Sequence, residues 1–525
     1  MKIERLLLGL FASFLMVGCS QNDDLPNGGE ETKEQKSYVA VNICSPKTLG
    51  SRATDKDDFA DAVGTEAQVK NAHFFFFNDN GQAVSIKDGK NYVTKIITTN
   101  SDSDDNDYTE SMTEAVVVLE KPDVYPTRMV VVLNWDYDGA SLNLNDVQNN
   151  LAAQSIPESD AINQTTGFIM SSSVYYDNGI INYATITGAN FGANETEARN
   201  NPVIAYVERL AAKVEADLKT NDNDANYDSE IGAFKTGVVY KDAQTNTETP
   251  IYAKILGWQI NTTNPSSYLI KHLGDNWDET TTNRPFEGWN EKDKHRSYWG
   301  ISSTPASYTD KAFEYSNITE GFNSIAYCLE NTTTTTTKAV FKALIGKKDT
   351  DKFTALELWQ WYGKYYLTPE AMTLDVVKKI NAEVDLAGTN TIDVTADQIE
   401  LVYNNADETS YQIHFKLKDG VSDATIGSTT LNNIVQATDY AKNWADGKTY
   451  YFTSIKHLNG EPAVIRNHAY KLLVTKVEGL GTPVNDNTQP EIPVPVDPSD
   501  TETYIAAQIN VLSWRLVNNE VILGK

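Results

Sequence analysis

Apolar and polar residues alternate in many short segments of this chain, and a spacing of two is typical of β-strands with one buried face. Near the start of this pattern, a run of aromatic residues leads into the turn signal Asn78-Asp79-Asn80-Gly81. Strand-like segments separated by polar turns predict an antiparallel β domain. Its expected strands are residues 73–77, 91–98, 114–119 and 128–133. Residues 143–153 have helical spacing instead and predict a short helix beside the sheet.

The second half of the chain repeats the strand pattern over a longer span. Residues 207–218 open it, and their spacing fits either a helix or a strand. A domain boundary just before this segment gives domains at 53–205 and 206–482. Residues 272–322 are rich in Asn, Asp, Thr and Trp and are expected to form long surface loops. The expected strands are 237–240, 251–260, 337–345, 411–417, 449–455 and 470–478.

The last part of the chain, residues 483–525, combines a tether with a strand. Prolines recur between 483 and 498, and because proline fixes φ and donates no backbone hydrogen bond, this stretch should be extended and semi-rigid. The strand that follows needs a partner for its backbone and its apolar face. Its apolar face consists of Ile505, Ala507, Ile509 and Val511, and Trp514 follows where Ser513 breaks the alternation.

The first residues predict export. Lys2 and Arg5 precede an apolar run at 6–17 that is short for a membrane span, which is typical of a secretory signal at 1–18. The run ends in small residues before Cys19, and this resembles the lipobox of bacterial lipoproteins. The resemblance implies that the Cys19 thiol is acylated and anchors the precursor in a membrane. The acidic stretch after it is similar to the surface-export signal of Bacteroidetes lipoproteins.

A second strand that could detach lies near the start of the chain. Residues 37–44 place Val39, Val41 and Ile43 on one face, and a loop of small residues with Arg52 and Ala53 follows. Exposed loops of this kind concentrate proteolytic sites, so residues 19–52 are interpreted as a removable propeptide. Nearby Lys47 and Lys56 are competing sites. Alternatively, 37–44 is simply the first strand of the first domain.

The composition of the chain excludes some classes of binding partner. The chain has 525 residues, 40% of them hydrophobic, which is enough for two or three domains with ordinary cores. Its net charge of −28 repels nucleic acid and anionic membranes, so neither is expected as a partner. Of the three cysteines, Cys19 and Cys44 precede the expected cut, so no disulfide is expected in the mature protein and Cys328 is expected in the core.

No residue pattern predicts catalysis. The six histidines lack metal-site spacing, and phosphate-loop and nucleophile-elbow motifs do not occur. The acidic runs 102–107 and 222–226 lack the turn glycine and terminal Glu of a calcium loop and are interpreted as solvated turns. We therefore expect no enzyme, no metal and no cofactor.

Several segments together resemble the Mfa1-like major fimbrial shaft subunits (fimbrillins, type V pilins) of Bacteroidales. They follow one another in the order expected of that family. These are the Cys19 lipobox, residues 36–38, Gly50-Ser51-Arg52-Ala53, residues 207–214, Tyr327-Cys328-Leu329-Glu330-Asn331-Thr332, residues 464–471 with 479–481, and Ile509-Asn510-Val511-Leu512-Ser513-Trp514.

The resemblance implies a mainly β fold with two transthyretin-like antiparallel β-sandwich domains, a few short helices and a donor-strand tail. An Arg-specific protease would cut between Arg52 and Ala53, and the vacated groove would accept the tail strand of a neighbouring identical subunit. Tip and anchor proteins would be further partners, and the product would be an extracellular fimbrium that supports adhesion from the outer membrane. The alternatives are a tip or anchor adhesin, or a surface glycan-binding lipoprotein that uses loop residues such as Trp277, Trp289 and Trp299.

Overall fold

The computed structural model describes residues 36–46, 62, 64–97, 109–120, 124–153, 156–163, 165–220, 225–305, 315–387, 392–403, 412–484, 504–512 and 519–520. The expected signal sequence, Cys19, Arg52, Ala53 and Trp514 lie outside these residues. Within this part of the chain, no helix has the length and apolarity to cross a membrane. The protein is mainly β, with few helices and several separate sheets.

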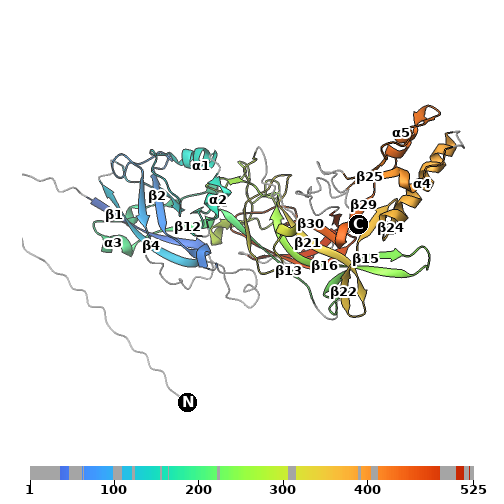
Figure 1. Ribbon diagram of the computed structural model, residues 1–525. Coiled ribbons are helices and arrows are strands. Elements are labelled where there is room, and N and C mark those ends of the chain that lie inside the picture. The colour runs from blue at the N-terminus through green and yellow to red at the C-terminus, as the bar shows by residue number, and fades with distance from the viewer. Residues whose placement is uncertain are drawn as a thin grey trace, which may run out of the picture. The chain divides into compact units, whose positions relative to one another are not determined.

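The first sheet has nine strands, which follow the order β11-β1-β12-β7-β5-β2-β3, with β4 paired to β1 and β10 paired to β5. Figure 1 labels β1, β2, β4 and β12 of this sheet. Three short helices and a small hairpin of β8 and β9 accompany it. The strands are β1 Lys36–Pro46, β2 Asn71–Phe77, β3 Tyr92–Ile96, β4 Thr109–Glu120, β5 Arg128–Leu133, β7 Met170–Ser172, β8 Tyr175–Tyr176, β9 Ile180–Ile181, β10 Ala184–Thr185, β11 Phe191–Gly192 and β12 Val203–Arg209, and the helices are α1 Leu144–Ala153, α2 Glu158–Ala161 and α3 Glu195–Asn200.

Both faces of the first sheet are covered, which explains the unbroken aromatic run in β2. Phe74 and Phe76 point into one core, whereas Phe75 and Phe77 point into a second core on the other face. The second core includes Leu144 and Val147 of α1. A strand buried on both faces needs apolar residues at every position rather than at alternate ones. The predicted strands of this region and the predicted helix at 143–153 are confirmed.

The second β region is built from two further sheets. The five-stranded sheet has the order β20-β13-β31-β33-β34, and the seven-stranded sheet has the order β14-β15-β16-β21-β30-β32 with β22 on β21. Val214 and Leu472 of the first meet Trp258 and Phe341 of the second in one core. The strands are β13 Ala211–Leu218, β14 Tyr227–Asp228, β15 Ala233–Lys241, β16 Glu248–Asn261, β20 Ala326–Leu329, β21 Lys338–Asp349, β22 Lys352–Ala355, β30 Lys448–Ser454, β31 Ala469–Glu478, β32 Thr482–Pro483, β33 Tyr504–Leu512 and β34 Asn519–Glu520.

The chain passes between the two β regions at Leu210. Residues 207–218, whose period fitted a helix or a strand, form the end of β12 and all of β13. β12 belongs to the first sheet and β13 to the five-stranded sheet, so the change of sheet falls inside this segment and not before it. Leu210 is buried in the second core of the first sheet.

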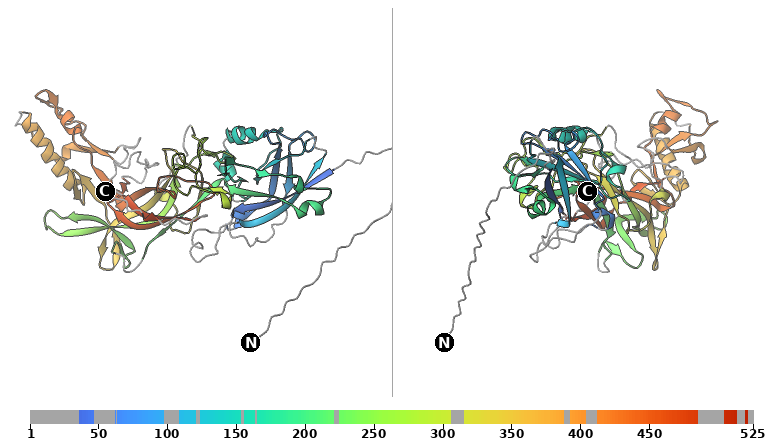
Figure 2. Two further views of the ribbon diagram at one scale, coloured as in Figure 1. Left: turned by 180° about the vertical axis from the view of Figure 1, so that it is seen from behind. Right: turned by 90° about the vertical axis from the view of Figure 1, so that its left-hand side faces the viewer.

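A smaller module lies between β22 and β30. It has its own core, to which Trp359, Met372, Ile380 and Phe415 contribute. Leu358 at its beginning and Trp444 at its end are Cα partners in one ladder. Figure 2 shows its helices in orange beside its short strands. These elements are β23 Leu358–Trp361, β24 Lys364–Tyr366, α4 Pro369–Leu386, β25 Ile399–Tyr403, β26 Ile413–Leu417, β27 Thr425–Ile426, β28 Thr429–Thr430, α5 Leu431–Gln436 and β29 Lys442–Trp444.

The prediction that residues 272–322 form surface loops is wrong for two of their aromatic residues. Trp289 is only 2% exposed and Tyr298 is fully buried. Trp289 belongs to the second core of the first sheet, and the partly buried Trp277 packs edge-on against it with ring centroids 5.6 Å apart. Within this segment the short strands β18 Asn290–Glu291 and β19 Arg296–Ser297 pair with each other. Just before it, β17 Ser266–Ser267 pairs with β6 Ile156–Pro157 of the first β region. Trp277 and Trp289 are therefore packing residues and do not form a surface for a glycan.

Candidate assembly site

β1 is a central strand of the first sheet, although it is the first strand that the structure describes. On one side it pairs antiparallel with β4, from Lys36 opposite Glu120 to Ser45 opposite Ser111. On the other side it runs parallel to β12, with Val41 opposite Val203. A short antiparallel pairing with β11 extends that side. Backbone groups of β1 are thus satisfied along both edges.

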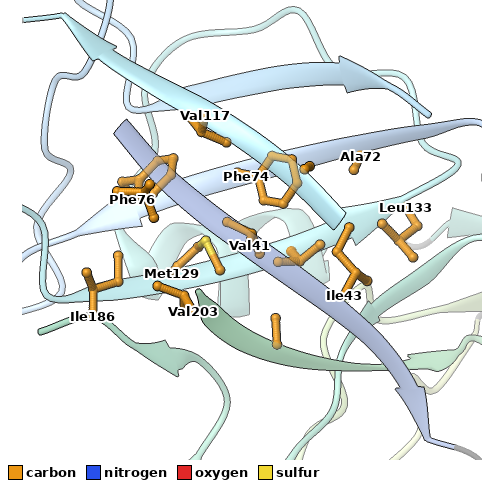
Figure 3. Packing of buried hydrophobic residues seen from close by; sticks show 14 of the residues in the cluster. Val41, Ile43, Ala72, Phe74, Phe76, Val117, Met129, Leu133, Ile186 and Val203 are labelled. Atoms are coloured by element: carbon orange, nitrogen blue, oxygen red, sulfur yellow. The ribbon is translucent and has the colours of Figure 1, made fainter. Parts of the chain in front are cut away.

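The apolar face of β1 lies in a closed core. Val39, Val41 and Ile43 are buried, and they pack among residues of β2, β4, β5 and β12. Figure 3 shows Val41 and Ile43 directed toward Phe74, Phe76 and Leu133. Burying each of the three side chains stabilises the fold by about 1.5–3 kcal/mol relative to leaving it exposed. The prediction that 37–44 is a strand with this buried face is confirmed.

β4 depends on β1 for its place in the sheet. Among the described residues, β1 is the strand with which β4 forms its ladder. Other contacts of β4 are the ion pair of Arg199 in α3 with Glu114 at 2.7 Å, the ion pair of Lys87 with Glu120 at 3.0 Å, and the hydrogen bond from the Glu120 N–H to the Ile86 carbonyl at 2.7 Å. Without β1, a long groove would therefore open between the edges of β4 and β12.

The predicted tail strand is β33, and the structure pairs it within its own chain. β33 runs antiparallel to β31, from Glu478 opposite Tyr504 to Ala469 opposite Leu512, with an irregularity between Val474 and Lys476. On its other side, β34 adds the pairs Gln508–Glu520 and Ile509–Asn519 within the described part of the chain. The positions of Ile505, Ala507, Ile509 and Val511 are thus backbone-paired to the second β region. The structure does not bring β33 and β1 together, because they belong to different sheets.

A buried carboxylate, that of Glu66, holds the short helix that precedes β2. Glu66 lies in the 3-10 helix η1 Gly64–Ala67 and is 1% exposed. Lys213 Nζ lies 2.9 Å from its Oε1, and the Tyr327 hydroxyl donates to the same oxygen at 2.5 Å. Arg209 Nε–H donates to the Glu66 backbone carbonyl at 2.6 Å. These contacts tie the start of the first β region to strands β12, β13 and β20, and sequence reasoning missed them.

A second buried network contains two ion pairs. Arg466 contacts both carboxylate oxygens of Glu330, and Lys271 Nζ lies 2.6 Å from Glu208 Oε2. Burial raises the pKa of Glu208 and lowers the pKa of Lys271, while the attraction between them opposes both shifts. Glu330 and Arg466 both occur in segments that carry the family resemblance. They join segments that are distant in sequence.

Two buried histidines extend this network. His457 Nε2–H donates to the Tyr298 carbonyl at 2.6 Å, so its Nδ1 accepts the Tyr470 hydroxyl at 2.8 Å. His468 Nδ1–H donates to the Arg466 carbonyl at 2.8 Å, and its Nε2 has no hydrogen-bond partner among the described residues. Burial lowers the pKa of His457 to about 3 and holds the pKa of His468 well below its usual value. Both rings are neutral at pH 7.

The described residues offer no metal centre. Across the ranges that the structure covers, no group of three or more His, Cys, Asp or Glu side chains is placed to hold a metal ion. Cys328 is buried in the core, as expected. The acidic run 102–107 lies outside the described residues, as does most of 222–226.

The fold defines the class of this protein as mainly β, and one part of its sequence matches a known family. Residues 442–520 match the family model "Major fimbrial subunit protein type IV, Fimbrillin, C-terminal". This match spans β29 to β34, and therefore includes both β31 and β33. Residues 442–520 are thus similar to the C-terminal part of fimbrillins.

The similarities between this chain and solved structures are weaker. A candidate cell adhesion protein from Parabacteroides distasonis is 12% identical, with 92% of this chain and 98% of that chain covered and a TM-score of 0.36. Another from Bacteroides eggerthii is 13% identical, with 93% and 98% covered and a TM-score of 0.35. The tip fimbrial protein Mfa3 from Porphyromonas gingivalis is 9% identical, with 90% and 99% covered and a TM-score of 0.26. No curated protein sequence matches the chain.

Proposed function

We propose that this protein is a shaft subunit of a fimbrium, and that copies polymerise head-to-tail when the C-terminal strand of one replaces β1 of the next. The observation that carries the proposal is the position of β1. It is central in its sheet, yet the segment that follows it contains the expected processing site at Arg52 and Ala53. One cut there would free a strand that the rest of the sheet needs. The domains would then be transthyretin-like sandwiches, as the family resemblance implies.

The apolar spacing of the tail strand is compatible with the position that β1 occupies in the first sheet. Ile505, Ala507, Ile509 and Val511 repeat the period of two with which Val39, Val41 and Ile43 fill the core. An added strand completes main-chain ladders while alternate side chains fill pockets, which is the mode known as β-augmentation. The replacement therefore restores both kinds of contact that removal of β1 would break.

The pairing geometry of the groove suits an incoming strand. Among the described residues, β33 has a ladder with β31 on one side and two residue pairs with β34 on the other. In the groove between β4 and β12, a strand would have ladder partners along both edges. In the proposed complex the strand is therefore paired along both of its edges. A contact of this head-to-tail kind does not close on itself, so it produces a filament.

In this proposal the precursor is exported as a lipoprotein acylated at Cys19 and is held at the outer membrane until an Arg-specific protease removes residues 19–52. A tip or anchor subunit is the main alternative. A subunit that terminates a filament lacks either a donor strand or a processing site, whereas this sequence contains candidates for both.

The test is electron microscopy of the purified precursor after limited digestion with an Arg-specific protease. Filaments are expected from the full chain and not from a variant that lacks residues 499–525, which should remain soluble and folded. Filaments of equal length from the truncated variant would contradict the donor-strand role. A full chain that is cut but stays monomeric would favour a terminal subunit instead.

A further inference from the structure

A cleft of about 380 Å³ lies over β12, on the side opposite the core that contains Val41. Along β12, Val203 and Ala205 point into that core, whereas Ile204 and Tyr206 alternate with them, and Ile204 is 52% exposed. The cleft has a volume within the range of small-molecule sites, roughly 300–1,000 Å³. Its walls come from β8, β9, β10 and from the segment around His295.

Aromatic rings line this cleft, and their neighbours fix their positions. The His295 ring stacks on Tyr206 with centroids 3.9 Å apart and 15° between the planes. The same ring meets Tyr175 edge-on at 5.4 Å, and its Nδ1 lies 3.1 Å from the Tyr175 hydroxyl. His295 has a left-handed φ of 52°, and the Ser173 hydroxyl donates to its carbonyl at 2.8 Å. The aromatic wall is therefore formed before any ligand arrives.

Charges of both signs flank the cleft. The Arg128 guanidinium lies over the Tyr183 ring, 4.5 Å from its centroid, on one side. Asp177 lines the cleft itself and is paired with Lys292, 3.3 Å away. A cationic ligand would be opposed by Arg128 and Lys292. An anionic ligand would be opposed by Asp177 and by the net charge of −28 of the chain.

These features describe a site for a neutral, polar molecule that has one flat apolar face. We propose that the cleft binds a neutral pyranose unit of a glycan. The C–H face of the sugar would lie against the aromatic wall, and its hydroxyls would bond to Asp177 and to the Tyr175 hydroxyl. An ionised carboxylate offers about four acceptor sites, so Asp177 can accept sugar hydroxyls while it contacts Lys292.

Binding is tested on the unprocessed full chain, so the result does not depend on polymerisation. The probes are the methyl glycosides of glucose, galactose, mannose, fucose and N-acetylglucosamine, measured by calorimetry. Choline and sialic acid serve as charged probes. At least one neutral glycoside is expected to bind with a dissociation constant below about 10 mM. If none binds, or if a charged probe binds more tightly, the proposal is wrong.

Three variants locate the binding. Tyr206→Ala and Asp177→Asn are each expected to weaken it about tenfold, by loss of stacking and of the charged acceptor. Asp177 is half-exposed, so its variant keeps the test valid if Tyr206→Ala unfolds. Tyr362→Ala, at a tyrosine that is 68% exposed in the α4 module, is the matched control and should bind like the wild type. Unchanged affinity in Asp177→Asn would overturn the assignment of the site.

Discussion

Glu330 and Arg466 form an ion pair whose side chains are both 0% exposed, although the residues are 136 positions apart in the sequence. The guanidinium also donates to the Ser267 hydroxyl and to the carbonyls of Tyr268 and Leu269. Burying a charge is costly unless its partners satisfy it, and here one arginine is satisfied by two segments distant from it in sequence, Glu330 and residues 267–269. These contacts therefore hold the residues just before β31 against residues 267–269 and the segment that follows β20.

Removing one member of this pair should be strongly destabilising. We expect Arg466→Met to lower the free energy of unfolding by about 3–5 kcal/mol, because it leaves the Glu330 carboxylate buried and unpaired. Urea unfolding followed by tryptophan fluorescence measures the change. The double variant Glu330→Leu with Arg466→Met should recover part of the loss. Lys379→Met, at an exposed helical ion pair with Glu383, is the control and should barely move the unfolding midpoint.

Stability should fall in mild acid because of His457 and His468. Their pKa values are lower in the folded protein than in the unfolded chain, so below about pH 6.5 the unfolded chain binds protons that the folded one does not. The stability contributed by the neutral rings is present above that pH and is lost as the pH falls toward 3. The expected slope is about 1.4 kcal/mol per pH unit for each histidine.

Comparing unfolding at pH 7 and pH 5 checks this expectation. His468→Gln keeps a donor for the Arg466 carbonyl and removes one titrating ring, so its stability should depend less steeply on pH than that of the wild type. Because carboxylates titrate equally in both proteins, the difference in slope isolates the histidine. Identical slopes would show that His468 makes no such contribution.

One face of the tail strand should control polymerisation. Ile509→Asp places a charge on the face expected to enter the neighbouring core, so filament formation after processing should fall at least about tenfold. Asn510→Asp adds the same charge one position along, on the other face, and should polymerise normally. Filament mass measured by sedimentation compares the two. Equal loss in both variants would show that charge alone, and not the buried face, is responsible.

Processing at Arg52 should be required for assembly. Arg52→Ala is expected to leave a folded precursor that retains β1 and stays monomeric after treatment with an Arg-specific protease. Mass spectrometry of the product locates the cut, and electron microscopy detects filaments. Lys56→Ala should be processed like the wild type. Polymerisation of Arg52→Ala at the wild-type rate would place the essential cut elsewhere.

Local pattern was enough to predict β1, β2, β5 and α1, because each is set by the spacing of its own apolar residues. It missed α4, even though Thr368 caps this helix through the Ala371 N–H and Pro369 occupies its first turn, both of which are readable signals. The burial of Trp289 was not predictable in this way, since a polar loop becomes part of a core only when another element covers it. The same holds for Glu66, Glu208, Lys271, Glu330 and Arg466, whose partners are distant in sequence.

The α4 module departs from the body of the protein and returns to it at neighbouring points, because Leu358 and Trp444 face each other in one ladder. An insertion whose ends already meet adds little loop-closure cost, whatever its length. A longer, shorter or different module could therefore stand between β22 and β30 in related chains without a change in the sheets to which these two strands belong.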